Sequence, residues 1–284
     1  MDYAFKPVSE HQNGATFPVR RMDYSFEGIN RDFIKNNPVS SALWIAFQAY
    51  FPEGEQFFVD SVRASQKEIT DPQLKRDVSA FIGQEAMHGK EHKVANLAFA
   101  KVGINVNKLE KAAGWVRKQT NQRLGKKLRL AVTAAAEHFT GVIAQQIAFH
   151  PGFLSGVTDP QIKQLILWHA MEETEHRAVA FDLYQHTKGD YLTRALGMGI
   201  VSAGIAPVVL VDMVACLRQT GQLSKTKAWA EFLVDYWGPK GFFTQAVPEL
   251  MKYFKADFHP NQENPEELLH AFRRYLDIVE PTFH

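Results

Sequence analysis

The feature that most constrains the fold of this chain is a motif that occurs twice, 88 residues apart. Asp71-Pro72-Gln73-Leu74-Lys75 reappears as Asp159-Pro160-Gln161-Ile162-Lys163. An Asp-Pro pair places an N-cap and a first-turn proline at the start of a helix. In each copy a Glu follows the Asp by fourteen residues and a His follows that Glu by three, which yields Glu85 and His88, then Glu173 and His176. The repeat therefore predicts two related helices that carry the same polar pair in the same register.

Helical periodicity continues through nearly all of the chain after Pro38. Apolar residues recur at spacings of three and four, and no alternating stretch persists, so the sequence predicts an all-α fold. Residues 1–37 lack this period and are expected to form an extended arm. We expect one helical domain over 38–284, with a helical bundle over about 38–190 and a C-terminal helical elaboration over 191–284.

Start and stop signals divide the helical part. They predict helices over 72 to about 103, 105–122, 126–149 and 160–189, an apolar helix over 195–217, and three short helices beyond it. Pro52 predicts a further helix start.

The charge balance restricts the partners. The chain has 32 Lys and Arg against 31 Asp and Glu, a net charge of +1. It shows no basic excess, which argues against a nucleic-acid or anionic-lipid partner. The single cysteine, Cys216, excludes an intrachain disulfide, and the N-terminus has no apolar signal segment, so we expect a cytoplasmic protein.

The repeated Glu-x-x-His motif indicates a metal site. Residues three apart lie on one face of a helix, so each motif offers a carboxylate and an imidazole together. Two such helices, with one Glu from each of two others, hold two metal ions in a four-helix bundle. Glu137 follows three alanines in an apolar helix, where an acid is costly to bury without a cation. The fourth acid is Glu53 or Glu55, and spacing does not choose between them.

Three further histidines lie near these acids. His169 precedes Glu173 by four residues and shares its helix face, so we expect an additional ligand. His92 follows His88 by four residues, and we expect it to contact the metal ligands without binding the metal itself. His138 points about 100° away from Glu137 and is interpreted as structural.

These segments resemble two known families. Residues 19–24, 51–63, 81–88, 136–139 and 168–180 resemble the ferritin-like proteins described as predicted metal-dependent hydrolases, which implies a ferritin-like four-helix bundle core. The pattern is also distantly similar to that of the di-iron arylamine N-oxygenases, in which an extra histidine precedes the last Glu-x-x-His by one turn. That resemblance selects Glu55 over Glu53 and implies seven metal ligands: Glu55, Glu85, His88, Glu137, His169, Glu173 and His176.

Carboxylates with a few imidazoles suit iron or manganese, and one cysteine leaves no thiolate set for structural zinc. We expect two ions, with iron favoured and manganese the alternative. The favoured function is a di-iron enzyme that activates dioxygen to oxidise or oxygenate a small, mainly apolar substrate. The alternatives are a metal-dependent hydrolase that activates water and a non-enzymatic iron-binding protein. No catalytic residue beyond the ligands can be named.

Aromatic residues crowd the approach to Glu55. Trp44, Phe47, Phe51 and Phe58 are candidates for a substrate pocket, although aromatics at helical spacing more often form core.

The segment over 195–211 contains no charge and lies between Arg194 and Asp212. Seventeen residues are short for a membrane span of about 20, and extension to Leu217 would place Asp212 in hydrocarbon. We therefore expect a helix that is buried in the fold or in a homodimer interface, and a membrane anchor is the alternative.

Overall fold

The computed structural model describes residues 6–7, 14–262 and 265–276, and it confirms the all-α class. Two short strands, β1 (Lys6–Pro7) and β2 (Arg20–Arg21), pair antiparallel in the N-terminal arm. The helices are α1 (Pro38–Ser65), α2 (Pro72–Lys101), α3 (Asn107–Arg123), α4 (Lys126–Phe149), α5 (Phe153–Gly156), α6 (Pro160–His176), α7 (Val179–His186), α8 (Tyr191–Gln219), α9 (Thr226–Trp237), α10 (Phe242–Met251) and α11 (Glu266–Tyr275).

The two repeat helices begin as the motif predicts. The Asp71 carboxylate accepts a hydrogen bond from the backbone N–H of Leu74 at 2.7 Å. The Asp159 carboxylate accepts from the N–H groups of Gln161 and Ile162, both at 3.0 Å. These caps satisfy N–H groups that have no partner within the helix. Because both caps are fixed by neighbouring residues, the following Glu and His fall in the same register on α2 and α6.

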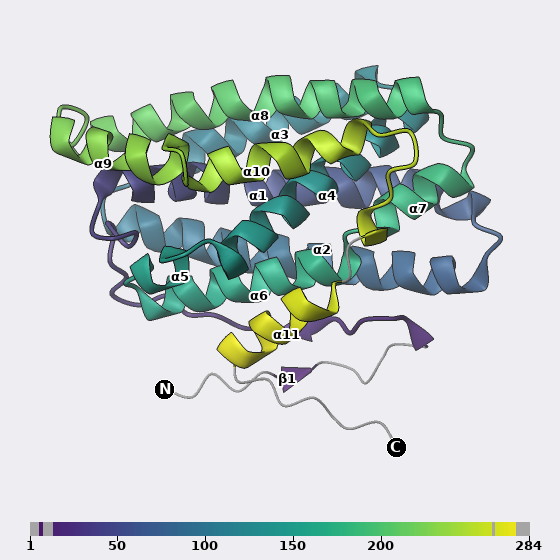
Figure 1. The fold of residues 1–284 in the computed structure, drawn as a ribbon, viewed down its shortest axis with the longest axis horizontal. Coiled ribbons are helices and arrows are strands. Elements are labelled where there is room, and N and C mark those ends of the chain that lie inside the picture. The colour runs from purple at the N-terminus through teal and green to yellow at the C-terminus, as the bar shows by residue number, and fades with distance from the viewer. Residues whose placement is uncertain (1–5, 8–13, 263–264, 277–284) are drawn as a thin grey trace.

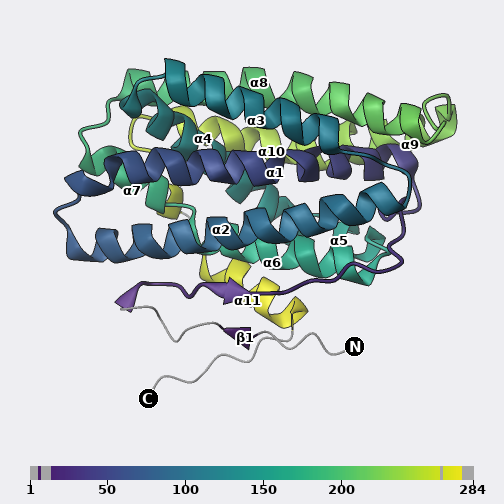
Figure 2. The same ribbon diagram turned by 180° about the vertical axis from the view of Figure 1, so that it is seen from behind.

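The long helices pack as two pairs. α1 lies along α2 and α4 lies along α6, and α1 also contacts α4. In both views α8 covers α1 and α4 on the side away from α2 and α6, with α3 on one flank and α9 and α10 on the other (Figures 1 and 2). The described part of the arm passes along α2 and α6, where the Glu91 carboxylate accepts from the Tyr24 N–H at 3.0 Å.

Two expected boundaries differ from the structure. Pro52 does not start a helix but lies inside α1, which begins at Pro38 after the Asn37 cap. An internal proline removes one helix hydrogen bond, and the packing of α1 on α2 and α4 holds the helix on both sides of it. The helix expected over 160–189 is two helices, because Arg177 and Ala178 interrupt the hydrogen bonds between α6 and α7. Both residues keep right-handed backbone angles, so no Gly or Pro marks the break.

The core surrounds a polar centre. His88 contacts the buried ring of Trp168 at 4.9 Å between centroids, and His176 contacts the buried ring of Phe81 at the same separation. Trp168 and Phe81 belong to two separate apolar clusters. The motif histidines are therefore enclosed by apolar packing from both sides.

α8 is less buried than expected. By length and mean hydropathy (2.3) it is a candidate membrane span among the described residues, and a third of its most apolar window is buried. Leu192 is 77% exposed and Val211 is 66% exposed. The prediction of burial within the fold is therefore wrong for the outer side of α8, because no other described element covers that side. The homodimer alternative stays a prediction.

Candidate metal centre

The structure brings together the side chains that the motif and the resemblance selected. α1 contributes Glu55, α2 contributes Glu85 and His88, α4 contributes Glu137, and α6 contributes His169, Glu173 and His176. All seven are buried. The two Glu-x-x-His helices face each other across this cluster, as the repeat predicts.

Glu85 and Glu173 lie between the two motif histidines. His176 Nε2 is 3.1 Å from Glu85 Oε1 and 3.5 Å from Glu173 Oε1. His88 Nδ1 is 3.8 Å from Glu85 Oε2 and 3.7 Å from Glu173 Oε1. Each of these two acids therefore lies close to both motif histidines.

The other two acids, Glu55 and Glu137, lie near different motif histidines. Glu137 Oε2 lies 3.3 Å from His176 Nε2, on one side of the cluster. Ligand atoms of Glu85, Glu137 and His176 lie within 4.8 Å of one another, and so do those of Glu55, Glu85 and His88 and those of His88, His169 and Glu173. The geometry thus offers two adjacent positions with three or more donors each.

Most of these donor atoms are buried and have no hydrogen bond within the described chain. This holds for both oxygens of Glu55, Glu85 and Glu137, and for His88 Nδ1, His176 Nε2 and Glu173 Oε2. A buried charged group without a partner costs several kcal/mol. Two divalent cations would balance the charge of four carboxylates and occupy these lone pairs. The residues present therefore fit a two-metal centre.

Burial and neighbouring charges shift the pKa values of the carboxyl and imidazole groups in the cluster. Burial raises the pKa of Glu137 to about 8, although His176 acts in the opposite direction. Burial also raises the pKa of Glu55 well above its usual value. Burial alone would lower the pKa of His88, but the hydrogen bond to Glu172 and the nearby Glu85 carboxylate outweigh it and raise the pKa. Burial also acts to raise the pKa of Glu85 and Glu173, but the neighbouring histidines outweigh it and lower both values. Buried acids whose pKa values are shifted in opposite directions are typical of metal sites and active sites.

Residues outside the seven orient the motif histidines, and the sequence analysis missed them. His88 Nε2 donates to Glu172 Oε2 at 3.1 Å, which leaves Nδ1 to face the cluster. His176 Nδ1 donates to Gln84 Oε1 at 2.9 Å, which leaves Nε2 to face it. Gln84 and Glu172 each precede the Glu of their own motif by one residue, and each supports the His of the opposite helix. The repeat contained this signal, because both positions are equivalent in it.

The N-terminal arm completes this support. Arg20 donates to Glu172 Oε1 at 2.9 Å and to both oxygens of Glu175, at 2.7 and 2.6 Å. Gln84 Nε2 also donates to Glu175, at 2.8 Å, which fixes the orientation of its amide. Such partners hold the tautomer and the ring of a metal-binding histidine.

The two additional histidines, His169 and His92, both lie at the cluster, and ligand atoms of Glu55, His92 and His169 lie within 4.8 Å of one another. His169 Nε2 lies 2.8 Å from Glu173 Oε1 and 3.9 Å from Glu55 Oε1. His92 lies behind it, with its Nε2 2.5 Å from His169 Nδ1 and its Nδ1 2.8 Å from Gln48 Oε1. His92 Nε2 is also 3.5 Å from Glu55 Oε1, so it borders the cluster.

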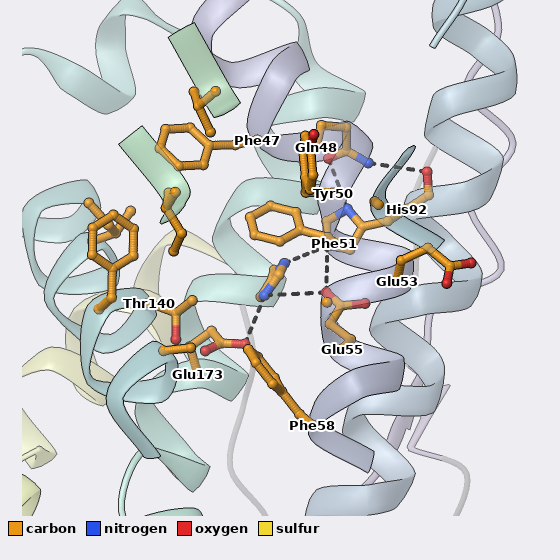
Figure 3. Close-up of a pocket in the computed structure, with 18 of the residues that line it drawn as sticks. Phe47, Gln48, Tyr50, Phe51, Glu53, Glu55, Phe58, His92, Thr140 and Glu173 are labelled. Carbon is orange, nitrogen blue, oxygen red and sulfur yellow. Dashed lines mark hydrogen bonds and ion pairs between the residues drawn. The ribbon is translucent and has the colours of Figure 1, made fainter. Parts of the chain in front are cut away.

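Two candidates lie outside the cluster. His138 bonds the carbonyl oxygen of Glu249 at 3.2 Å and packs against Tyr253 and Phe258. Glu53 pairs with Arg117 at 2.7 Å and points away from Glu55 (Figure 3). The structure therefore places Glu55, and not Glu53, among the ligand candidates.

An apolar cavity of about 380 Å³ ends at the cluster. Glu55, His92, His169 and Glu173 lie in its wall, and Phe51 packs over His92 and His169 with ring centroids 4.7 and 4.8 Å away (Figure 3). The four predicted pocket residues, Trp44, Phe47, Phe51 and Phe58, all line it. Side chains from α3, α4, α6, α8 and α10 complete the wall. The cavity can hold a small apolar molecule beside the cluster.

Comparison with known proteins agrees with this chemistry. Searches of curated proteins and of solved structures found no match. The model of one family, described as predicted metal-dependent hydrolase, matches residues 18–264, a range that includes every ligand candidate. The family and the buried His and Glu clusters both indicate metal dependence. The chain belongs to the family of predicted metal-dependent hydrolases.

Proposed function

We propose that this protein is a two-metal, preferably di-iron, carboxylate enzyme that uses dioxygen to oxidise or oxygenate a small, mainly apolar substrate. The observation that carries the proposal is the place of the cluster: four carboxylates and three imidazoles lie at the inner end of an apolar cavity. A ferritin-like four-helix core of α1, α2, α4 and α6 accounts for this arrangement.

The ligand roles follow from the distances. Glu137 and His176 would hold one ion, and Glu55, His88 and His169 would hold the other. Glu85 and Glu173 would bridge the two, because each reaches both motif histidines. Oxygen and imidazole donors favour iron, with manganese as the alternative. When bound, two ferrous ions would supply the electrons that reduce dioxygen.

The chain itself prepares the site for such chemistry. Glu172 and Gln84 keep one nitrogen of each motif histidine directed at the cluster. The rings that line the cavity exclude water and would place an apolar substrate beside Glu55 and Glu173.

Hydrolysis is the second candidate, and the family description favours it. Two adjacent ions can activate a water molecule with the same ligands. The mainly apolar lining of the cavity favours an apolar substrate, which suits the oxidative reaction. A non-enzymatic iron-binding protein is the third candidate, and a substrate-sized cavity beside the cluster is an argument against it.

Metal analysis and dioxygen uptake separate these candidates. The protein would be loaded with ferrous iron under anaerobic conditions, its bound metal measured, and its dioxygen consumption followed with an electrode. We expect two equivalents of iron and uptake that is lost in Glu85→Ala. A protein that binds two zinc ions, ignores dioxygen when iron-loaded and cleaves apolar esters would establish the hydrolase instead. Iron binding with neither activity would leave the iron-binding protein.

A further inference from the structure

The outer side of α8 is an apolar stripe without charge. Its large members are exposed: Leu192, Leu196 and Ile200 recur every four residues, and Leu210 and Val211 lie ten and eleven residues after Ile200, beyond the exposed small residues Ala203, Ala206 and Pro207. No charged residue lies between Arg194 and Asp212, and both of these are buried. Soluble monomers rarely expose a continuous apolar surface of this kind, so it indicates a contact with a partner.

α3 lies on one flank of α8, and α9 and α10 lie on the other (Figures 1 and 2). α9 and α10 expose Leu233, Val234, Trp237, Val247 and Met251, and α3 exposes Trp115 and Val116. We call these residues and the stripe on α8 together the α8 face. The tryptophans are 61% and 56% exposed and lie on opposite flanks. Exposed tryptophan at the border of an apolar surface is typical of proteins that contact the membrane interface.

The cavity opens onto the α8 face. Val116 of α3 and Ile200 and Gly204 of α8 are exposed, yet all three line the cavity. Its mouth therefore lies between α3 and α8, and its other end reaches Glu55 and His169. A second copy of the chain on this face would close the mouth. A lipid surface would instead leave an apolar route from the acyl chains into the cavity.

α3 supplies charge next to the apolar stripe. It carries five Lys or Arg residues and one acid, Glu110, and one of the five, Arg117, pairs with Glu53 and Asp60 of α1. Lys108, Lys111, Lys118 and Arg123 are exposed. The overall net charge of +1 conceals this local excess, because acids elsewhere in the chain balance it. Basic residues beside an apolar face attract anionic lipid head groups.

The inner side of α8 keeps the helix on the body of the protein. A Cβ atom at Gly197 would lie 2.6 Å from the carbonyl oxygen of Ala131, so α8 and α4 are in close contact there. The buried Asp212 carboxylate faces the hydroxyl of Tyr50 on α1. Val201 and Val209 form part of the cavity wall. A helix tied to α1 and α4 in this way can rest on the surface of a bilayer. If α8 instead crossed the bilayer, it would separate from α1 and α4 and leave the cavity open on that side.

We propose that the α8 face binds the surface of an anionic phospholipid bilayer, with the cavity mouth directed into the lipid. The docking does not depend on the proposed reaction. Where both hold, the substrate is a lipid-soluble molecule that enters from the membrane.

Vesicle flotation tests the docking with the full chain. The probes are vesicles of phosphatidylcholine alone and of phosphatidylcholine mixed with phosphatidylglycerol, each at low and high salt. We expect binding to the anionic vesicles, weaker binding at high salt, and release by carbonate. No flotation with anionic vesicles at low salt would overturn the proposal. Retention after carbonate would overturn it in favour of a membrane span.

Matched variants locate the contact. Leu196→Gln with Val211→Gln should lower the partition coefficient about tenfold or more, because both apolar side chains would lose contact with lipid. Leu97→Gln changes a side chain that is 63% exposed on α2 and should have no effect. All variants would be compared by near-ultraviolet circular dichroism, and those that keep the wild-type spectrum would be scored.

Charge reversal supplies a second comparison. Lys111→Glu with Lys118→Glu on α3 should lower binding to anionic vesicles about tenfold or more, since each basic residue near the surface contributes about fivefold. Lys67→Glu with Lys93→Glu, on the η2 turn (Gln66–Glu68) and α2, should leave binding unchanged. Equal losses in both pairs would refute the assignment of the face. A dimer in sedimentation analysis that Leu196→Gln dissociates, with no lipid binding by the wild type, would assign the face to a second copy.

Discussion

Replacing Glu137 with Gln separates a metal ligand from a structural ion-pair partner. Both Glu137 oxygens are buried without a hydrogen bond, and the nearest cationic group is His176 Nε2 at 3.3 Å. Glutamine has nearly the same shape and no charge. If Glu137 served only to pair with His176, its replacement would destabilise the protein with or without metal. If it binds metal, the change should act in opposite directions in the two states.

The magnitude follows from the pKa of this carboxyl group. Folding raises that pKa from 4.5 to about 8, so between these values the native metal-free protein binds more protons than the unfolded chain. Stability contributed by this group therefore falls as the pH rises through that interval. Glu137→Gln removes the loss, and at pH 7 we expect the metal-free variant to be more stable by on the order of 1–3 kcal/mol.

The metal-loaded protein should respond in the opposite sense. An ion present at one hundred times its dissociation constant stabilises the native state by about 2.7 kcal/mol. Two ions should then raise the melting temperature by roughly 10 °C, because about 2 °C corresponds to 1 kcal/mol in a chain of this size. In Glu137→Gln we expect about half of that increase or less.

Thermal unfolding by calorimetry, with and without ferrous iron or manganese at pH 7, measures both effects. Glu267→Gln removes an exposed acid on α11 and should leave both melting temperatures unchanged. A variant that is less stable without metal, and that gains as much stability from metal as the wild type, would refute the reasoning.

The remaining predictions concern metal content, affinity, pH and access. Glu85→Ala and Glu173→Ala should each lose at least one equivalent of metal by elemental analysis, because each carboxylate reaches both motif histidines; two equivalents retained in both would contradict the ligand assignment. Glu172→Gln should keep the fold and weaken metal binding by about 10- to 100-fold in chelator competition, because His88 would lose its charged partner; unchanged affinity would exclude this role. Metal affinity should fall between pH 8 and pH 6, since Glu137, with a pKa of about 8, must release its proton to bind; titrations that show no pH dependence would argue against it. Gly204→Trp should fold, because nothing lies within 4 Å of its Cβ position, and should slow entry of an apolar fluorescent probe into the cavity; an unchanged entry rate would place the mouth elsewhere.

Much of the fold could be predicted because its signals are local. The caps at Asp71 and Asp159 involve contacts within three residues, and α4 spans the predicted residues, Lys126–Phe149. The spacing of Glu and His in each motif needs only helix geometry to place both on one face. Local signals failed where packing overrode them, as at Pro52 inside α1, or where no special residue marks a change, as between α6 and α7.

The sequence by itself determined which residues could bind metal, since the chemistry of a carboxylate or imidazole and its place along a helix are properties of the chain. The tertiary structure alone decided which side of each helix faces the centre. Glu53 and Glu55 are about 200° apart around α1, and the packing of α2 and α6 turns Glu55 inward while Glu53 meets Arg117. The pairing of Gln84 and Glu172 with the histidine of the opposite helix, and the exposure of the outer side of α8, were decided in the same way. Both depend on how segments far apart in the chain pack together; the repeat marks Gln84 and Glu172 as equivalent positions but does not show which side chains they contact.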